Sequence, residues 1–109
     1  MLRPLDRSDL PALTRILRET GAFTEGEVDC ALELLNIVLD DPRQLDYLVT
    51  VAEDERRVAG YILYGPVPLT EGVLDIYWIA TDPTVQGKGF GRQLMLHAEK
   101  EARRRGAQG

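Results

Sequence analysis

The chain has 109 residues, of which 44% are hydrophobic and 28% charged, and its formal net charge is −5. This length predicts one domain over residues 1–109, and the hydrophobic content excludes an intrinsically disordered chain. No apolar run approaches the roughly 20 residues that a membrane-spanning helix needs, and the acidic balance opposes binding to nucleic acid.

The first elements expected are a short strand and a helix. Residues 2–5 read as an extended segment broken by Pro4. Ser8 or Asp9 is placed to cap a helix, Pro11 is tolerated in its first turn, and Gly21 supplies a stop. One face of this helix is apolar, with Leu10, Leu13 and Leu17 at helical spacing.

A second helix is predicted to begin near Thr24. Its spacing to Glu27 fits a capping box, in which each residue bonds the backbone of the other. An apolar stripe follows at helical spacing: Val28, Ala31, Leu32, Leu35, Val38 and Leu39. The helix should end at Asp41 and Pro42, because proline disfavours helix at the preceding residue.

Three strands and a last helix complete the chain. Residues 47–52 (YLVTVA) and 58–64 (VAGYILY) are rich in β-formers and should pair as a hairpin across a polar turn. Residues 73–80 (VLDIYWIA) are almost wholly apolar, as in a strand covered on both faces. Gly89 or Phe90 begins a helix that runs to about residue 105. The order strand, helix, helix, hairpin, strand, helix predicts an α+β domain.

A glycine-rich turn at residues 86–91 (QGKGFG) lies between the third predicted strand of this group and the last helix. Glycine lets the backbone take positive φ and approach a ligand without a Cβ clash. The free N–H groups of a helix's first turn, with the helix dipole, form an anion site, and Lys88 and Arg92 add positive charge at its rim. Residues 83–109 carry 6 basic and 2 acidic side chains, which also favours an anionic ligand.

The spacing of the glycines restricts the class of ligand that the turn can bind. The dinucleotide pattern G-x-G-x-x-G fails, because from Gly87 the last glycine falls on Arg92. The P-loop pattern fails as well, since Lys88 is followed by glycine and no glycine stands five residues before Gly87. The pattern Q/R-x-x-G-x-G/A fits. It resembles the coenzyme A signature of the GNAT superfamily of N-acetyltransferases.

This resemblance covers residues 1–109, from the family's first strand through its third helix, and implies a mainly antiparallel sheet flanked by helices. Acetyl-coenzyme A would be the acyl donor, and the acceptor would be the amine of a small molecule or peptide. The implied pyrophosphate site consists of backbone amides of Gln86, Gly87, Lys88, Gly89, Phe90, Gly91 and Arg92. Main-chain groups of Ile79, Ala80 and Thr81 would pair with the pantetheine arm, as a strand pairs with a sheet edge. Residues 21–27 and 66–72 would line the acceptor.

Asp75 is the candidate general base, because it lies eleven residues before Gln86, where some family members place a glutamate. An ordinary aspartate has a pKa of about 3.9, so this role needs its apolar neighbours to raise the pKa. The alternative is that Asp75 binds a cationic acceptor or faces solvent. In a regular strand Tyr77 and Ile79 share the face of Asp75, so Tyr77 would line the acceptor site while Trp78 packs in the core. A β-bulge would invert this phase.

Other reactive residues suggest no further site. His97 borders the apolar stripe of the last helix and is expected to be a packing or surface residue. Cys30 has no signature of an activated thiol and no second cysteine to pair with, which favours a reducing, cytoplasmic location. No set of ligands has metal-site spacing, so no metal is expected.

The resemblance stops at the third helix. Family members continue into a further strand, a helix and a hairpin that carry the tyrosine acid. The last strand of this chain would therefore expose an apolar edge. The chain is a fragment, a protein completed by a second copy or another chain, or a degenerate protein. Its function is correspondingly an N-acetyltransferase, a non-catalytic coenzyme A-binding or interaction module, or a structural domain.

Overall fold

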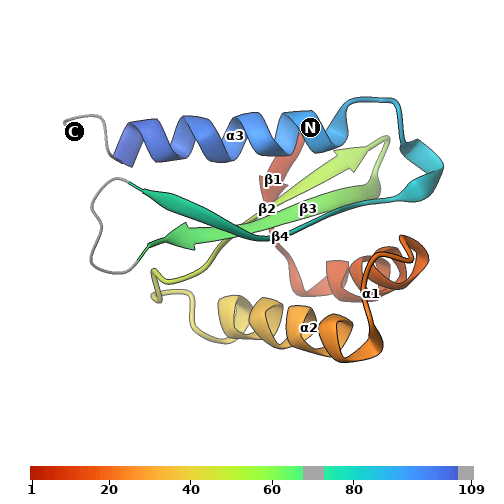
Figure 1. Ribbon diagram of the computed structural model, residues 1–109, viewed down its shortest axis with the longest axis horizontal. Coiled ribbons are helices and arrows are strands. Elements are labelled where there is room, and N and C mark those ends of the chain that lie inside the picture. The colour runs from red at the N-terminus through yellow and green to blue at the C-terminus, as the bar shows by residue number, and fades with distance from the viewer. Residues whose placement is uncertain (68–72, 106–109) are drawn as a thin grey trace.

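A computed structural model describes residues 1–67 and 73–105 and has three layers, with one sheet between two layers of helices (Figure 1). In chain order the elements are β1 (Leu2–Pro4), the 3₁₀ turn η1 (Arg7–Asp9), α1 (Leu10–Glu19), α2 (Glu25–Asp40), β2 (Leu48–Asp54), β3 (Arg57–Pro66), β4 (Leu74–Thr81), the 3₁₀ turn η2 (Pro83–Val85) and α3 (Phe90–Arg105). The predicted α+β order is confirmed. In the described ranges, no helix is long and apolar enough to cross a membrane.

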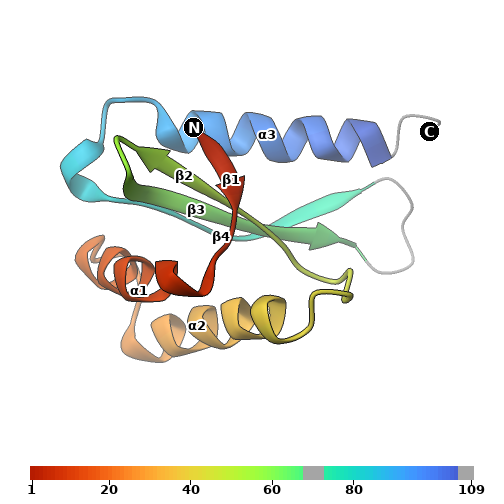
Figure 2. The ribbon, with the colours of Figure 1, turned by 180° about the vertical axis from the view of Figure 1, so that it is seen from behind.

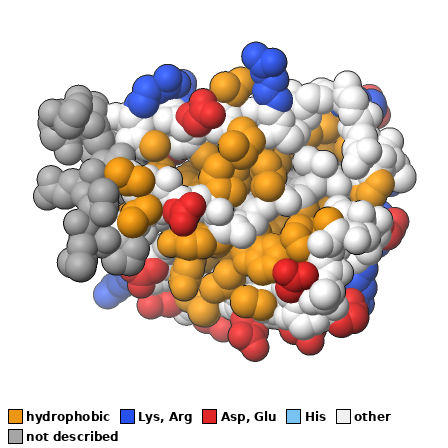
Figure 3. Space-filling view, viewed as in Figure 1, with side chains coloured by type: hydrophobic (Ala, Val, Ile, Leu, Met, Phe, Trp, Pro, Cys, Tyr) orange, Lys and Arg blue, Asp and Glu red, His pale blue; other side chains and the backbone are white. Residues whose placement is uncertain are grey.

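The sheet is antiparallel throughout, in the order β1-β2-β3-β4. Helix α3 lies along one face, and α1 and α2 cover the other (Figures 1 and 2). Strand β4 therefore forms an edge, with β3 as its only strand partner in the described part of the chain. Apolar side chains gather across the middle of the face seen in Figure 1 (Figure 3).

Each face of the sheet has its own apolar core. Between the sheet and α1 and α2, the buried residues are Leu13, Ile16, Leu17, Val28, Ala31, Leu35, Val51, Tyr61, Leu63 and Ala80. Beneath α3 they are Ala52, Ala59, Ile62, Tyr64, Phe90, Leu94 and Ala98. The helical stripes read from the sequence supply the helix side of both cores, because residues three and four apart share a helix face.

The start of the first helix agrees with the prediction in part. Asp9, one of the two predicted caps, stands at the N-cap position of α1, but its side chain makes no cap hydrogen bond. The side-chain cap lies earlier, at Asp6, whose carboxylate accepts from the backbone N–H of Ser8 at the start of η1. Asp9, only 4% exposed, instead accepts from the backbone N–H of Asp6 and from the Arg3 guanidinium. A short 3₁₀ turn therefore precedes α1, and the prediction missed Asp6 as the residue that caps it. The predicted Thr24–Glu27 capping box of α2 is present.

A β-bulge in β4 overturns the predicted phase of that strand. Leu63 pairs with Trp78 and Tyr64 with Ile76, so Tyr77 is an extra residue in the ladder. Trp78 packs in the core against α1 and α2, and the Tyr77 ring meets Tyr47 in the same layer. Ile79 packs beneath α3 instead. Tyr77 and Ile79 thus do not share a face, because a bulge shifts the alternation by one residue.

Candidate functional site

The glycine turn joins η2 to α3 in a conformation that requires glycine. Gly87 has φ of 90° and Gly89 has φ of 83°, in the left-handed region that side chains with a Cβ rarely adopt. Apart from the chain neighbours of each glycine, no atom of the described residues lies within 4 Å of the Cβ position of either one. Glycine is therefore required at these two positions by the backbone conformation and not by steric crowding. The space beside the turn is open to a ligand.

The first turn of α3 has backbone N–H groups without acceptors. The first N–H to find one belongs to Gln93, which donates to the Gly89 carbonyl at 3.0 Å. The N–H groups of Gly89, Phe90, Gly91 and Arg92 precede it and have no backbone acceptor in the described chain. Four such groups at a helix N-terminus, together with the helix dipole, form a site for an anion.

Three of these four residues border a hollow of about 290 Å³, which is lined by Thr81, Val85, Gln86, Gly87, Gly89, Phe90 and Gly91. The hollow lies between the end of β4 and the start of α3, the two elements that were predicted to flank the site. Lys88 lies at the rim, but its ammonium is 3.3 Å from the Asp54 carboxylate on the β2–β3 hairpin. Arg92 is exposed in the first turn of α3. The donors and open space fit a phosphate-bearing group.

Asp82 anchors the segment that leads into the turn, and sequence reasoning assigned it no role. Its side chain is only 3% exposed and lies 2.9 Å from the Arg15 guanidinium of α1. One carboxylate oxygen also accepts from the N–H and hydroxyl of Thr84. Burial by itself raises the pKa of Asp82, but the hydrogen bonds from Arg15 and Thr84 outweigh it and lower the pKa to about 2. The Asp82-Pro83-Thr84 sequence, a capping residue before proline, was the available signal.

The main chain near the end of β4 is the other segment predicted to contact acetyl-coenzyme A. Ile79, Ala80 and Thr81 pair with Ile62, Tyr61 and Gly60 of β3, and their opposite edge has no partner strand in the described ranges. The side chains play different parts: Ile79 packs beneath α3, and Ala80 is buried against α1 and α2. An extended ligand could therefore reach main-chain groups along this edge.

Asp75 and Tyr77 lie together farther along β4. Ile76 packs beneath α3, so Asp75, its neighbour in an alternating strand, faces the side of α1 and α2 that Tyr77 also faces. Asp75 is exposed, so the apolar neighbours do not enclose it among the described residues. Tyr77 is 39% exposed, with its ring 5.7 Å from that of Tyr47. The two side chains can meet a ligand from solvent.

Of the two segments predicted to line the acceptor, the first reaches β4 through aromatic packing. Phe23, between α1 and α2, meets Trp78 edge to face with ring centroids 5.0 Å apart. The loop after α1 is thus fixed beside the strand that holds Asp75. In the second segment, residues 68–72 lie outside the described residues.

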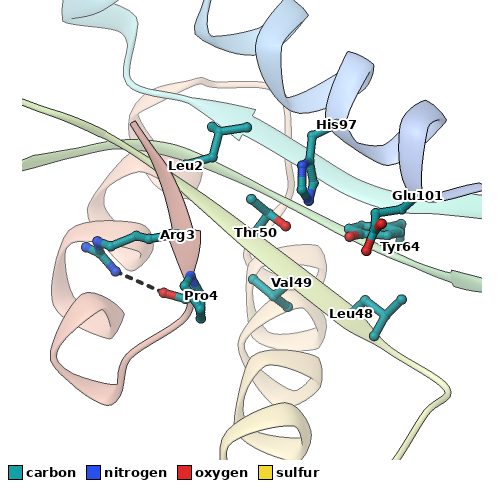
Figure 4. Close-up of a pocket in the computed structure, with 9 residues that line it drawn as sticks. All are labelled: Leu2, Arg3, Pro4, Leu48, Val49, Thr50, Tyr64, His97 and Glu101. Atoms are coloured by element: carbon teal, nitrogen blue, oxygen red, sulfur yellow. Dashed lines mark hydrogen bonds between the residues drawn. The ribbon is translucent and has the colours of Figure 1, made fainter. Parts of the chain in front are cut away.

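A second hollow, of about 320 Å³, lies between β1, β2 and the C-terminal half of α3 (Figure 4). His97 points into it toward Thr50, and Glu101 lies over Tyr64. No glycine turn or helix N-terminus borders it, and the carboxylate of Glu101 disfavours a phosphate. His97 is half-buried there. Across the described residues, no three His, Cys, Asp or Glu side chains are placed to hold a metal.

A strand–glycine turn–helix junction of this kind, on the edge of a mainly antiparallel sheet, is typical of acyltransferase domains that use coenzyme A. The model of the acetyltransferase (GNAT) family matches residues 10–109. The chain belongs to this family.

Solved structures show the same fold. A protein from Desulfovibrio desulfuricans described as a GNAT-family acetyltransferase is 36% identical, with a TM-score of 0.84 over 94% of this chain and 65% of its own. The PaiA N-acetyltransferase of Thermoplasma acidophilum, crystallised with coenzyme A, is 23% identical, with a TM-score of 0.75 over 97% of this chain and 73% of its own. The ribosomal-protein-S18-alanine N-acetyltransferase of Escherichia coli is 23% identical, with a TM-score of 0.73 over 97% and 61%.

This chain therefore spans slightly less than two thirds of the first of these proteins. No curated protein matches the sequence at a significant level.

Proposed function

We propose that this protein transfers an acetyl group from acetyl-coenzyme A to the primary amine of a small molecule or peptide. Family membership supports the acyl transfer. The observation on which the proposal mainly rests is the row of amides from Gly89 to Arg92 that have no backbone acceptor in the described chain. Gly89, Phe90 and Gly91 also line an open hollow at the start of α3.

The glycine turn would hold the pyrophosphate of the donor. The amides of residues 86–92, apart from Lys88, whose N–H donates to the Val85 carbonyl, would donate to phosphate oxygens. The α3 dipole would add partial positive charge. Lys88 could bind a phosphate only after breaking its ion pair with Asp54, in which the ammonium lies 3.3 Å from the carboxylate at the surface. Such an exposed ion pair contributes about 1 kcal/mol or less, so replacing Asp54 by a phosphate costs little free energy.

The open edge of β4 would hold the pantetheine arm. The main chain of Ile79, Ala80 and Thr81 would pair with the arm's amide groups, in the manner of an added strand. Since these contacts come from the backbone, the packing of the Ile79 side chain beneath α3 and of the Ala80 side chain against α1 and α2 leaves them available.

The bound donor supplies an activated thioester carbonyl, and the chain's own residues would orient the amine against it. Positioning of this kind can supply roughly 7–11 kcal/mol of the barrier. Asp75 would accept the proton that the amine loses, directly or through water, which typically adds about 10²–10⁴-fold. Tyr77 would line the acceptor beside it. Since Asp75 is exposed, we expect positioning to contribute more than base catalysis.

A direct test measures free thiol release from acetyl-coenzyme A across a panel of primary amines, together with calorimetry of coenzyme A. The proposal expects binding and amine-dependent thiol release. Absence of binding at millimolar coenzyme A would refute the donor site.

The turn itself is tested with Gly89→Val, which should abolish binding because valine cannot take φ of 83° without displacing the amides. Gly21→Val is the matched control. Gly21 also has positive φ, 69°, and open space at its Cβ position, but it lies between α1 and α2. Equal loss of binding in both variants would attribute the effect to general instability.

A second candidate function is a coenzyme A-binding module without catalysis, favoured by the edge of β4, which has no further strand partner among the described residues. A second copy or another chain could complete that edge, and a homodimer is one form of this. Coenzyme A binding without thiol release across the amine panel would favour the module. Sedimentation would show whether a dimer forms. We place either activity in the cytoplasm, on the evidence of the lone cysteine.

A further inference from the structure

We infer that Arg15 of α1 is a positioning residue for the glycine turn and acts on it through the buried carboxylate of Asp82. The inference rests on the proposed function, because the turn's task is taken to be holding the coenzyme A pyrophosphate. Arg15 lies 67 residues before Asp82 in the chain, and its guanidinium donates to Asp82 Oδ2 at 2.9 Å.

Asp82 connects three parts of the fold. Its backbone N–H donates to the Ala59 carbonyl of β3 at 2.7 Å. Its Oδ1 accepts from the N–H of Thr84 at 2.9 Å and from the Thr84 hydroxyl at 2.8 Å, which begins η2. Its Oδ2 accepts from Arg15. One residue thus joins the sheet, the entry to the glycine turn and α1.

Arg15 is the cation that makes this arrangement stable. The Asp82 side chain is 3% exposed, and a carboxylate removed from water without a positive partner is strongly disfavoured. Loss of Arg15 would leave the charge buried and unpaired, and Asp82 would move toward solvent. Because the Thr84 contacts are made by the same carboxylate, η2 would move with it.

A displacement of Asp82 and η2 would also move the glycine turn, because backbone hydrogen bonds connect them. The Val85 N–H donates to the Asp82 carbonyl at 3.0 Å, and the Lys88 N–H donates to the Val85 carbonyl at 3.3 Å. Gly89 follows at once, and its carbonyl accepts the first bond of α3. Each link from Asp82 to the free amides is therefore a short backbone contact.

Arg15 itself is well placed to act as a fixed point. The buried residues Leu13, Ile16 and Leu17 hold α1 against the sheet. Glu19, one turn along α1, accepts from Arg15 Nη1 at 2.8 Å, which orients the guanidinium. Arg15 is 42% exposed, so it contacts Asp82 from the rim of the buried site, and it is not itself one of the residues that line the hollow at the turn.

The test is a double-mutant cycle on coenzyme A binding, measured by calorimetry at pH 7 with Arg15→Met, Asp82→Asn and the pair. Asparagine keeps an acceptor for Thr84 and removes the charge. Each single variant should weaken binding about tenfold, and the double variant should be no weaker than either. This outcome is a coupling of about tenfold, which lies within the range found for residues in contact. Multiplied effects in the double variant would overturn the inference, because the residues would then act independently.

Arg18→Met is the matched control. Arg18 lies on the same helix and forms an exposed ion pair with Glu25 at 3.3 Å, so its loss should leave coenzyme A binding unchanged. Arg15→Lys keeps a cation and should restore part of the affinity, which a packing role of the arginine stem alone would not explain. Equal binding by Arg15→Met and Arg18→Met would overturn the inference.

A second readout separates this inference from the proposed function. Backbone order parameters at Gly87 and Gly89, measured by NMR without ligand, should fall in Arg15→Met from the rigid value of about 0.85 toward about 0.6. Arg18→Met should leave them unchanged. If wild-type protein fails to bind coenzyme A but the order parameters fall as expected, the donor site is wrong and the positioning holds. Unchanged order parameters refute the positioning. If Arg15→Met does not fold, Arg15→Lys and Asp82→Asn are compared in the same way.

Discussion

Protonation of Asp82 should remove a measurable part of the protein's stability in acid. The pKa of this carboxyl is about 2 in the folded chain, against 3.8 for an ordinary aspartate. Burial alone would raise it, and the hydrogen bonds from Arg15 and Thr84 more than reverse that effect. The folded chain therefore binds the proton more weakly than the unfolded chain does.

The sign and size follow from this difference. A depressed pKa stabilises the fold above the unfolded pKa, and the contribution is lost as pH falls from about 4 to about 2. A difference of nearly two pKa units corresponds to about 2 kcal/mol at pH 7, of which about 1 kcal/mol is lost by pH 3. Asp82 is almost fully buried, but Arg15 is 42% exposed and screened by solvent, so these figures are upper values.

Urea unfolding at pH 7 and pH 3 measures this contribution. Asp82→Asn cannot titrate, so its stability relative to wild type should be lower by about 1–2 kcal/mol at pH 7 and by about 1 kcal/mol less than that at pH 3. Asp40→Asn is the control, because Asp40 forms an ion pair with Arg7 in which both side chains are at least 60% exposed. A wild-type minus Asp82→Asn difference that stays constant between the two pH values would refute the reasoning.

Three further outcomes are expected. Tyr61→Phe should leave the free energy of unfolding unchanged or raise it by up to about 1 kcal/mol, because the Tyr61 hydroxyl is buried without a partner in the described structure; a loss in urea unfolding would reveal a partner. Thr24→Ala should lower it by about 1 kcal/mol through loss of the α2 cap, whereas Thr14→Ala within α1, whose hydroxyl donates only to the Leu10 carbonyl one turn back, should change it little. Asp75→Asn should lower acetyl transfer by about 100-fold and leave coenzyme A binding unchanged; equal loss of both would make Asp75 a structural residue.

Local signals predicted much of this fold. The capping box of Thr24 and Glu27 depends only on residues within four positions of each other, and the apolar residues Val28, Ala31, Leu32 and Leu35 that follow it pack in the core as predicted. Val38 and Leu39, the last two residues of the predicted stripe, are half-buried and lie outside that core. The glycine turn before Phe90 was equally readable, since positive φ at Gly87 and Gly89 is a requirement of the local backbone.

Features that depend on contacts between residues far apart in the chain could not be predicted from the sequence. The bulge at Tyr77 arises in the pairing of β4 with β3 and changes which side chains face α3, although a strand's own sequence shows only alternation. The Asp82–Arg15 contact joins residues that lie 67 positions apart, and the sequence around neither residue indicates which partner it binds. The side-chain cap at Asp6 was not predicted, because the carboxylate of Asp9 is held by the Arg3 guanidinium of β1 and by the Asp6 N–H, contacts that the local pattern does not show.

The claim that the first-turn amides of α3 hold the pyrophosphate of coenzyme A is tested most directly by NMR. Titration of the ¹⁵N-labelled protein with coenzyme A should shift the backbone amides of Gly89, Phe90, Gly91 and Arg92, because these are the donors without acceptors in the described chain. Pantetheine, which lacks the pyrophosphate, should leave them in place. Binding of coenzyme A without movement of these four signals, or equal movement with pantetheine, would contradict the account.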